Sequence, residues 1–295
     1  MNEETNRAEK MLLTPRHIKF IRTFALCAII ALAAGNTTLA KAQQFGTRSS
    51  SPGAQGSTCD TITVGGPASW QPVSYVTSDG HQTGLGIDII KEYAKREGID
   101  VEVDIELPWA RAVDFLLQGK IDVTAGAYFT NERQRIFQYS DPFYSDDIMV
   151  FQHTDRRFGY SRIEDLKGYR GARPHGGSLG NKIDTYSKQE LDIVYSPIND
   201  HIFDLLLAGH VDYVLLARYD GVATVRKLGV QDKIIPVEPP VAKNPVRLMF
   251  SRNSPCLEHV EQINKLIAEL SSNGTLQERI DYHLRQTVFD FETGS

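Results

Sequence analysis

Residues 101–125 read VEVDIELPWARAVDFLLQGKIDVTA, and this stretch holds two segments of strand character around one helical segment. Val101–Ile105 alternates apolar and polar side chains, as a half-buried strand does. Trp109–Gln118 places its apolar side chains on one helical face, and Gly119 follows as a helix terminator. Ile121–Ala125 predicts the second strand. A strand, a helix and a strand in this order predict a parallel α/β sheet.

The same alternation continues on both sides of this stretch. Upstream, Thr61–Val64 predicts a strand, and Gly86–Arg96 predicts a helix that ends at Gly98. Downstream of residue 150 the pattern starts again. The expected strands lie near Gly171 and at Ile193–Tyr195, Val211–Leu216 and Val246–Phe250. One helix is expected to begin at Gly176–Ser178. Further helices are expected at Ile202–Leu207, Ala217–Leu228, Cys256–Leu270 and Leu276–Leu284. The chain is therefore expected to form two α/β halves.

The composition is that of a globular protein. The chain has 295 residues, of which 41% are hydrophobic and 23% are charged, and these fractions exclude a disordered chain, a collagen-like fibre and a multi-span membrane protein. The 32 Lys and Arg against 37 Asp and Glu give a net charge of −5. This acidity argues against a nucleic-acid partner, which would require a basic surface.

The first residues have the composition of an export signal. Basic residues precede an apolar stretch from Phe24 to Gly35, and Ala40-Lys41-Ala42 supplies small residues for cleavage before Gln43. We therefore expect residues 1–42 to be a signal peptide and the protein to be periplasmic. The alternative is an uncleaved anchor, although the apolar stretch is shorter than the ~20 residues that span a bilayer. Translation starts at Met1 or at Met11.

Residues 43–57 are rich in Ser, Gly and Gln, and this composition predicts a flexible tether. Removal of the leader takes Cys27 with it and leaves Cys59 and Cys256. Two thiols in an oxidising compartment can form a disulfide, and the alternative is two unpaired buried thiols. We favour the Cys59–Cys256 disulfide.

The sequence contains no motif that assembles an enzyme active site. It has no P-loop and no dinucleotide fingerprint after a strand. Its eight His residues are scattered without the spacing of metal ligands. We therefore expect a protein without a metal or a cofactor, and a binding protein rather than an enzyme.

A different group of residues is expected at one edge of the sheet. Trp70, Trp109 and Arg133 all fall at or just beyond the carboxyl ends of predicted strands, where open parallel sheets bind ligands. A guanidinium group there can hold a carboxylate in a forked hydrogen bond. The alternatives are core packing for each Trp and a solvated ion pair between Arg133 and Glu132 or Asp141.

Several short motifs follow one another along the chain. They are a Gly- and Asp-containing stretch at Gly80–Asp88, Gly-Lys-x-Asp at Gly119–Asp122, Thr-x-x-Arg at Thr130–Arg133, Ser-x-Pro-Phe-Tyr at Ser140–Tyr144, Gly-x-x-Asp at Gly209–Asp212 and Ser-Asn-Gly-Thr at Ser272–Thr275. In this order the motifs resemble those of the family 3 periplasmic solute-binding proteins of ABC importers, which include the polar amino acid receptors. The Pro-Trp-Ala-Arg sequence at Pro108–Arg111 is similar to a subgroup of that family.

The resemblance implies a two-lobed type II clamshell, in which each lobe is a mostly parallel sheet flanked by helices. Lobe 1 would comprise residues 58–150 and 244–295, and lobe 2 would comprise residues 151–243. The chain would cross between the lobes twice, near Met149–Gln152 and near Lys243–Arg247. The ligand would bind between the lobes, as it does in other clefts that close by a hinge motion.

The resemblance also implies roles for single residues. Arg133 matches the arginine that holds the ligand carboxylate, and Trp70 and Trp109 match positions whose side chains sandwich the ligand. Gly177 and Ser178 match a small pair at a helix start in lobe 2, where free N–H groups attract an anion. Arg111 would add a second cation near the cleft. Tyr128 stands at the end of Ala125–Tyr128, where the amino acid receptors usually have serines, and we include it among the ligand-binding residues.

One departure from the amino acid receptors concerns the ligand's α-ammonium group. Those receptors place an acidic residue after the strand that follows Gly-x-x-Asp, whereas Leu215–Tyr219 contains no carboxylate. This difference fits ligands other than α-amino acids. The expected ligand is therefore a small carboxylate-bearing solute, either an amino acid or a related organic acid.

The leading hypothesis is a monomeric, exported receptor that closes on this solute and delivers it to an ABC permease in the inner membrane. A second hypothesis is a periplasmic lyase or dehydratase on the same scaffold. Its acid or base would be Asp88, Asp200 or His175, each of which has a structural alternative. A third hypothesis is a ligand-sensing partner of a membrane signalling protein.

Overall fold

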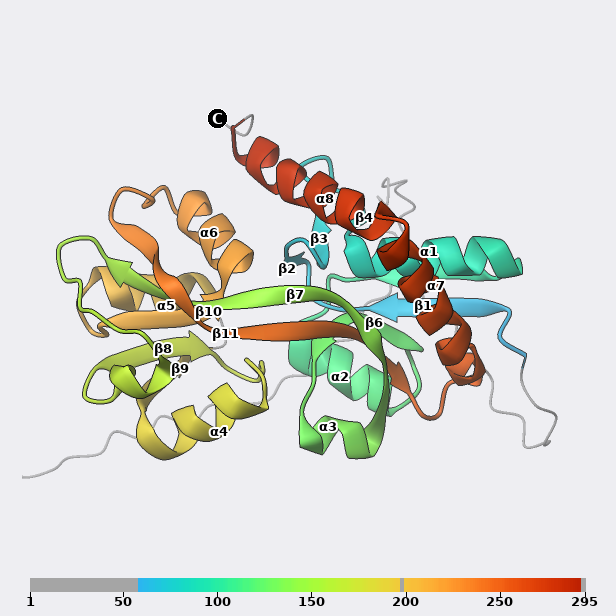
Figure 1. The fold of residues 1–295 in the computed structure, drawn as a ribbon, viewed down its shortest axis with the longest axis horizontal. Helices are drawn as coiled ribbons and strands as arrows, with labels where there is room; N and C mark the ends of the chain where they lie inside the picture. The colour runs from blue at the N-terminus through green and yellow to red at the C-terminus, as the bar shows by residue number, and fades with distance from the viewer. Residues whose placement is uncertain (1–57, 197–198, 293–295) are drawn as a thin grey trace, which may run out of the picture. The chain divides into compact units, whose positions relative to one another are not determined.

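The computed structural model describes residues 58–196 and 199–292 (Figure 1). The predicted signal peptide at residues 1–42, with its alternative start sites and Cys27, lies outside the described residues, and so does the predicted tether at residues 43–57. None of the helices within the described ranges combines the length and the apolar character that a membrane span requires.

An eight-stranded sheet forms the centre of the described part, in the order β5-β1-β6-β11-β7-β10-β8-β9. The strands at each end are parallel. One end comprises β1 (Thr61–Gly65), β5 (Asp100–Asp104) and β6 (Val123–Tyr128), and the other comprises β8 (Arg170–Pro174), β9 (Asp192–Ser196) and β10 (Tyr213–Ala217). We call the parts around these two ends the first and the second lobe. The expected two-lobed α/β architecture is therefore confirmed.

Two long antiparallel strands join the lobes. β7 (Phe137–His153) and β11 (Ile234–Ser251) pair with each other along most of their length. Residues 246–250 of β11 pair with β6 in the first lobe, whereas residues 148–151 of β7 pair with β10 in the second. Among the described residues, 145–147 and 243–245 pair only with each other. These segments are the two crossovers, and the predicted boundaries at 150/151 and 243/244 stay predictions.

The sequence analysis did not identify β7 and found only the last part of β11. Both strands contain proline, at Pro142 in β7 and at Pro236, Pro239 and Pro245 among others in β11. Proline cannot donate to a strand ladder, so it lowers the local strand signal. The pairing of two segments about a hundred residues apart then forms strands that neither segment indicates by itself.

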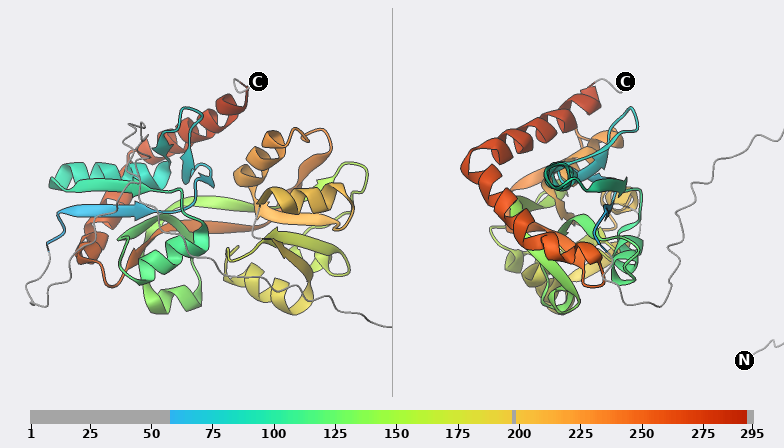
Figure 2. Two further views of the ribbon diagram at one scale, coloured as in Figure 1. Left: turned by 180° about the vertical axis from the view of Figure 1, so that it is seen from behind. Right: turned by 90° about the vertical axis from the view of Figure 1, so that its right-hand side faces the viewer.

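Helices cover both faces of the sheet. They are α1 (Leu85–Glu97), α2 (Trp109–Leu117), α3 (Asn131–Ile136), α4 (Asn181–Glu190), α5 (Asn199–Leu207), α6 (Arg218–Lys227), α7 (Val260–Ser272) and α8 (Thr275–Glu292), with 3₁₀ turns at Ile163–Leu166 and Pro255–His259. In both lobes the helices lie on opposite faces, with α1 across the sheet from α2 and α6 across it from α4 (Figures 1 and 2). A small sheet of β2 (Ser69–Trp70), β3 (Ser74–Val76) and β4 (Gln82–Thr83) precedes α1.

The two remaining cysteines form the expected disulfide. Cys59 and Cys256 are bonded across 197 positions of the chain, with their Cα atoms 4.9 Å apart. Both are buried in the core of the first lobe. The bond ties the residues before β1 to the turn before α7, so it joins the two separate chain segments of that lobe.

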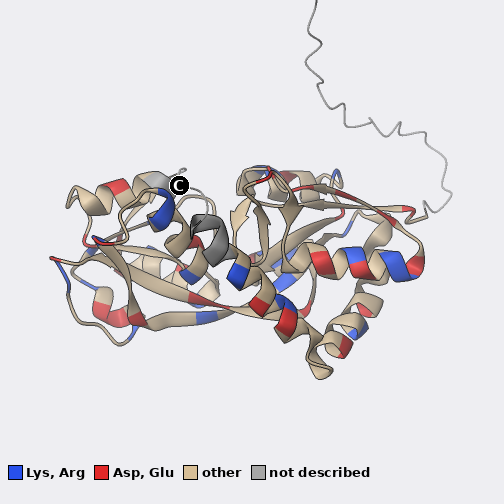
Figure 3. Ribbon diagram, turned by 90° about the horizontal axis from the view of Figure 1, so that it is seen from above, with Lys and Arg blue, Asp and Glu red and all other residues tan. Residues whose placement is uncertain are grey.

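The helices carry charges of both signs. In the ribbon seen from above, blue Lys and Arg positions and red Asp and Glu positions occur in both lobes (Figure 3).

Candidate ligand-binding cleft

A cavity of about 710 Å³ lies between residues of the two lobes. The first lobe contributes the segment from Pro67 to Trp70, the loop before α2, the end of β6 and Arg133 of α3. The second lobe contributes the loop between β8 and α4, the end of β10 and Asp220 of α6. Most of these segments follow the carboxyl ends of strands, which is where open parallel sheets bind ligands.

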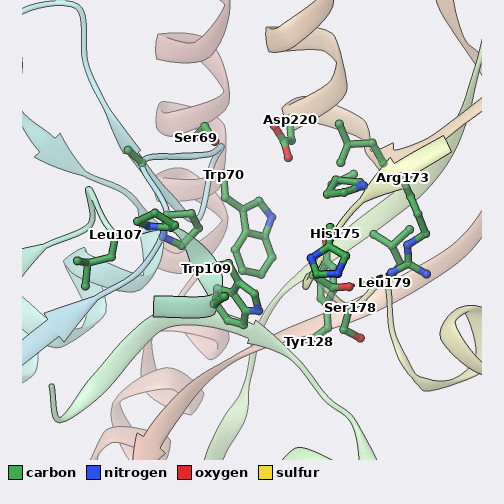
Figure 4. Close-up of a pocket in the computed structure, with 18 of the residues that line it drawn as sticks. Ser69, Trp70, Leu107, Trp109, Tyr128, Arg173, His175, Ser178, Leu179 and Asp220 are labelled. Atoms are coloured by element: carbon green, nitrogen blue, oxygen red, sulfur yellow. Dashed lines mark hydrogen bonds between the residues drawn. The ribbon is translucent and has the colours of Figure 1, made fainter. Parts of the chain in front are cut away.

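One side of the cavity is aromatic (Figure 4). The rings of Trp70 and Trp109 meet edge to face with their centroids 6.5 Å apart, and the rings of Trp70 and Tyr128 are 5.0 Å apart. We call these three side chains the aromatic wall. Because the two indoles contact each other and both belong to the first lobe, they do not face each other across a gap. The predicted sandwich between them is therefore wrong in this structure, and they offer one continuous surface instead.

Asp146 of β7 lies behind this wall. Its Oδ2 accepts hydrogen bonds from Trp70 Nε1 at 2.9 Å and from the Tyr128 hydroxyl at 2.8 Å. The side chain is fully buried, and burial raises the pKa of Asp146 to about 6 against the opposing effect of these two bonds. Burial is also the main cause that raises the pKa of Tyr128. The sequence analysis missed Asp146, because the contact depends on strand β7.

Arg133 reaches the cavity from the first turn of α3. Thr130 caps this helix, and its Oγ1 accepts a hydrogen bond from the Arg133 amide at 3.1 Å. The guanidinium carbon lies 5.0 Å from the centroid of the Trp109 ring, in a cation–π contact. Burial lowers the pKa of Arg133. The structure therefore places the predicted cation beside the aromatic wall.

The loop between β8 and α4 forms the opposite side of the cavity. Gly177 and Ser178 line it, but α4 begins at Asn181 with Gly180 as its N-cap, so the helix start predicted at Gly176–Ser178 is wrong by several residues. Gly180, the residue before the helix, has a φ of 90°, and this backbone conformation favours glycine. The Ser178 hydroxyl donates to Asp184 in the first turn of α4.

Arg173 of β8 is a further cavity residue that the sequence analysis did not identify. Its guanidinium is buried, with 3% of the side chain exposed, and it pairs with Asp184 at 2.8 Å. Its Nη2 also donates to the Gly177 carbonyl at 3.0 Å. These contacts connect the strand, the loop and the helix, so they hold the loop that carries Ser178.

Arg111 does not join this group. Among the α2 residues, Trp109 and Ala110 line the cavity, whereas Arg111 is exposed and is not part of the lining. Residues two positions apart on a helix point in different directions, so Arg111 cannot share the face of Trp109. Its predicted position beside the cleft is therefore wrong in this structure.

Asp220 supplies a carboxylate that the sequence analysis missed. It stands in the first turn of α6 and lines the cavity, and its carboxylate is directed toward the space beside Trp70 (Figure 4). Asp220 directly follows Leu215–Tyr219, the segment in which an acidic residue was expected from the amino acid receptors. An acidic residue in the first turn of a helix that follows a buried strand is the signal that identifies it.

The residues considered as acid or base for a lyase or dehydratase do not lie together. Asp88 is bonded to His283 at 2.8 Å, and only His175 lines the cavity. The side chain of Asp200 lies outside the described part. Within residues 58–196 and 199–292, no group of three or more His, Cys, Asp or Glu side chains is arranged to hold a metal ion.

The model of one family, described as bacterial extracellular solute-binding proteins, family 3, matches residues 62–286. The chain belongs to this family. Its members bind solutes and are not enzymes, so the expectation of a binding protein is confirmed.

Curated relatives and solved structures agree with this assignment. The chain is 22% identical to the L-cystine-binding protein TcyJ of Escherichia coli strain K12 over 74% of its own length and 80% of that protein. It is 24% identical to the histidine-binding periplasmic protein of the same strain, over 78% and 88%. A crystal structure of a mutant of ArgBP from T. maritima is similar with a TM-score of 0.64 and 23% identity, over 77% of this chain and 96% of that one.

A histidine kinase sensor domain with similarity to periplasmic binding proteins has the same fold. Its TM-score is 0.65 and its identity is 23%, over 76% of this family 3 protein and 96% of that chain. At these identities the solved structures establish the fold alone.

Proposed function

We propose that this protein is a periplasmic receptor that closes on a small amino acid and delivers it to an ABC permease. The observation that carries the proposal is a cation and an anion at one cavity. Arg133 of the first lobe and Asp220 of the second both line it, next to the aromatic wall. This pair suits a molecule with one carboxylate and one ammonium group. The names of the relatives, which bind cystine and histidine, support the same ligand class.

In this proposal Arg133 holds the ligand carboxylate. Its guanidinium already lies over Trp109, which fixes the plane in which a forked hydrogen bond can form. Asp220 holds the ammonium group from the second lobe. The aromatic wall supports the body of the ligand, and Gly177 and Ser178 approach it from the opposite side.

Closure would move the second lobe toward the first about the crossovers at 145–147 and 243–245. The ligand then favours the closed form because it contacts both lobes only there, and this differential affinity shifts the equilibrium. Export through the leader at residues 1–42, the monomeric state and delivery to a permease are parts of the same proposal. The family's extracellular place supports the periplasmic location.

Titration calorimetry with the mature protein tests this function. The panel contains L-cystine, L-histidine and L-arginine, together with carboxylic acids that lack an amino group and amines that lack a carboxylate. We expect micromolar or tighter binding of at least one amino acid, and much weaker binding of the compounds that lack either group. Equal binding of a simple carboxylic acid and its amino acid would contradict the role of Asp220, and heat from none of the panel would contradict the proposal.

A further inference from the structure

Asp146 is a fully buried carboxylate that contacts two of the three members of the aromatic wall. We propose that Asp146 is a positioning residue of the ligand site, which fixes the orientation of Trp70 and Tyr128 and makes the wall respond to proton concentration. The first part rests on the proposed function, because it assumes that the ligand packs against the wall. The response of the wall to protons does not depend on any ligand.

One oxygen of the carboxyl group makes both contacts. Oδ2 accepts from Trp70 Nε1 at 2.9 Å and from the Tyr128 hydroxyl at 2.8 Å. Trp70 belongs to β2, Tyr128 to β6 and Asp146 to β7, so a single oxygen atom connects three separate strands. Without this acceptor, an indole N–H and a phenol would both lose their buried partner, which is costly in a low-dielectric interior.

The second oxygen identifies the place for a proton. Oδ1 is buried and has no hydrogen-bond partner among the described residues. A proton on Oδ1 leaves Oδ2 free to accept both bonds, so the neutral carboxylic acid still holds the wall. The ionised carboxylate holds it with stronger, charge-assisted bonds but places a desolvated charge next to the indole. The two protonation states therefore give Trp70 different electrostatic surroundings.

Among the neighbours, the Asp147 carboxylate favours the neutral form of Asp146, whereas the Trp70 and Tyr128 side chains and the Asp147 backbone favour the ionised form. Asp147 lies next to Asp146 on β7, Tyr144 is on the same strand, and Tyr219 and Asp220 belong to α6. Asp147 is itself paired with Arg218 of α6 at 3.0 Å and with Lys243 of β11 at 3.7 Å. Arg218 and Lys243 are therefore bonded to Asp147. Burial is the main cause that raises the pKa of Asp146 to about 6, against the hydrogen bonds from Trp70 and Tyr128.

The first experiment requires no ligand. In the full mature chain carrying Trp109→Phe, Trp70 is the only tryptophan, and its fluorescence is followed from pH 4.5 to 8.5. We expect one transition near pH 6 that Asp146→Asn abolishes. Two control variants should retain the transition. Asp147→Asn changes the adjacent carboxylate, and His175→Gln removes the titratable imidazole that lines the same cavity. A transition that persists in Asp146→Asn, or that disappears in His175→Gln, overturns the response to protons.

The second experiment tests positioning. The affinities of Asp146→Ala, Asp146→Asn and Asp147→Asn for L-histidine and L-arginine are compared with that of the parent protein at pH 7.5. Asparagine keeps one acceptor oxygen, so we expect Asp146→Asn to stay within threefold and Asp146→Ala to weaken binding at least tenfold. Equal losses in both variants, or unchanged affinity in Asp146→Ala, overturn the positioning role.

The two experiments separate the possible failures. If the parent protein binds neither amino acid, the proposed function fails, while the fluorescence transition still decides the response to protons.

If Asp146→Ala does not unfold cooperatively, Asp146→Glu replaces it. Glu keeps an acceptor but displaces it by one methylene, so a positioning role predicts weaker binding than in Asp146→Asn. Affinity equal to that of Asp146→Asn overturns it.

Discussion

Asp146 of β7 lies directly opposite Asn244 of β11, where the two crossover strands pair only with each other among the described residues. Asp146 is bonded to Trp70 and Tyr128 of the first lobe, whereas Asn244 Nδ2 donates to the Leu179 carbonyl of the second at 2.5 Å. Two neighbouring residues of the crossovers therefore hold the two sides of the cavity. We therefore expect a rotation of the lobes about these strands to affect both sides of the site.

Asn244→Ala removes the bond that holds the second side. We expect ligand affinity to fall severalfold, because the loop that carries Ser178 loses its connection to β11, and stability to fall by about 1 kcal/mol. Titration calorimetry and urea unfolding measure the two effects. Asn253→Ala is the matched control, since Asn253 Nδ2 also donates to a carbonyl, that of Leu117 at 3.2 Å, but does not line the cavity. Equal effects on affinity from both substitutions would argue against the coupling.

Arg133→Ala should weaken amino acid binding at least tenfold. Hydrogen bonds to charged groups contribute ~1.5–3 kcal/mol each, so the loss of one guanidinium contact already has this size. Arg133→Lys should also be impaired, because an ammonium group cannot form the forked bond. Arg135→Ala, an exposed arginine of the same helix, serves as the control. Affinity of Arg133→Ala within twofold of the parent protein would exclude Arg133 as the carboxylate anchor.

Local signals in the sequence were sufficient for the parallel strands and their helices. Gly98, for example, ends α1 in the left-handed conformation with a φ of 71°, as its position after the helical pattern predicts. The crossovers were not predictable in this way, because their proline-containing segments form strands only by pairing with each other. Their register in turn decides where Asp146 and Asn244 lie.

The same distinction applies to the cavity. Trp70, Trp109 and Arg133 were predicted from their position at strand ends, and all three line one cavity. Tyr128, which was included because amino acid receptors usually have serines in that segment, lines the same cavity. Arg111 was predicted from the Pro-Trp-Ala-Arg motif, but it is exposed and is not among the residues that line the cavity. The indole contact that replaces the predicted sandwich is a tertiary property, and so is the approach of Asp220 from the second lobe.

Asp220→Asn should change selectivity more than overall binding. The substitution removes the anion that we assign to the ligand's ammonium group, so an amino acid should lose at least tenfold in affinity. The corresponding carboxylic acid without an amino group should bind equally well or better. Calorimetry with both compounds on each variant gives the comparison, and Asp232→Asn, an exposed residue outside the cavity, is the control. A parallel loss for both compounds would assign Asp220 a structural role.

Replacement of both disulfide cysteines by serine should lower stability without changing the cavity. Removal of a native disulfide typically costs about 2–5 kcal/mol, and the Cys59–Cys256 bond closes a loop across 197 positions. Because neither cysteine lines the cavity, ligand affinity should stay within twofold. Urea unfolding and calorimetry test the two statements. Free thiols in the native, oxidised protein would show that the bond does not form.

The stability of the protein should depend on pH through Asp146. Its pKa is about 6 in the folded protein against the ordinary value of 3.8, so the folded state binds the proton more tightly. The stabilisation by this proton is complete below pH 4 and is lost as the pH rises through 6. Its contribution to the free energy of unfolding is on the order of 3 kcal/mol, at 1.36 kcal/mol per pKa unit.

Urea unfolding of the parent protein and of Asp146→Asn at pH 4.5, 6 and 7.5 isolates this contribution. Asparagine cannot ionise, so the difference in unfolding free energy between the two proteins should shift in favour of Asp146→Asn as the pH rises. Most of this shift should fall between pH 4.5 and 6, and little of it between pH 6 and 7.5. Asp147→Asn, whose carboxylate is paired with Arg218 and Lys243, should not show this change. A difference between parent and Asp146→Asn that is the same at all three pH values would mean that Asp146 does not titrate in the folded protein within this range.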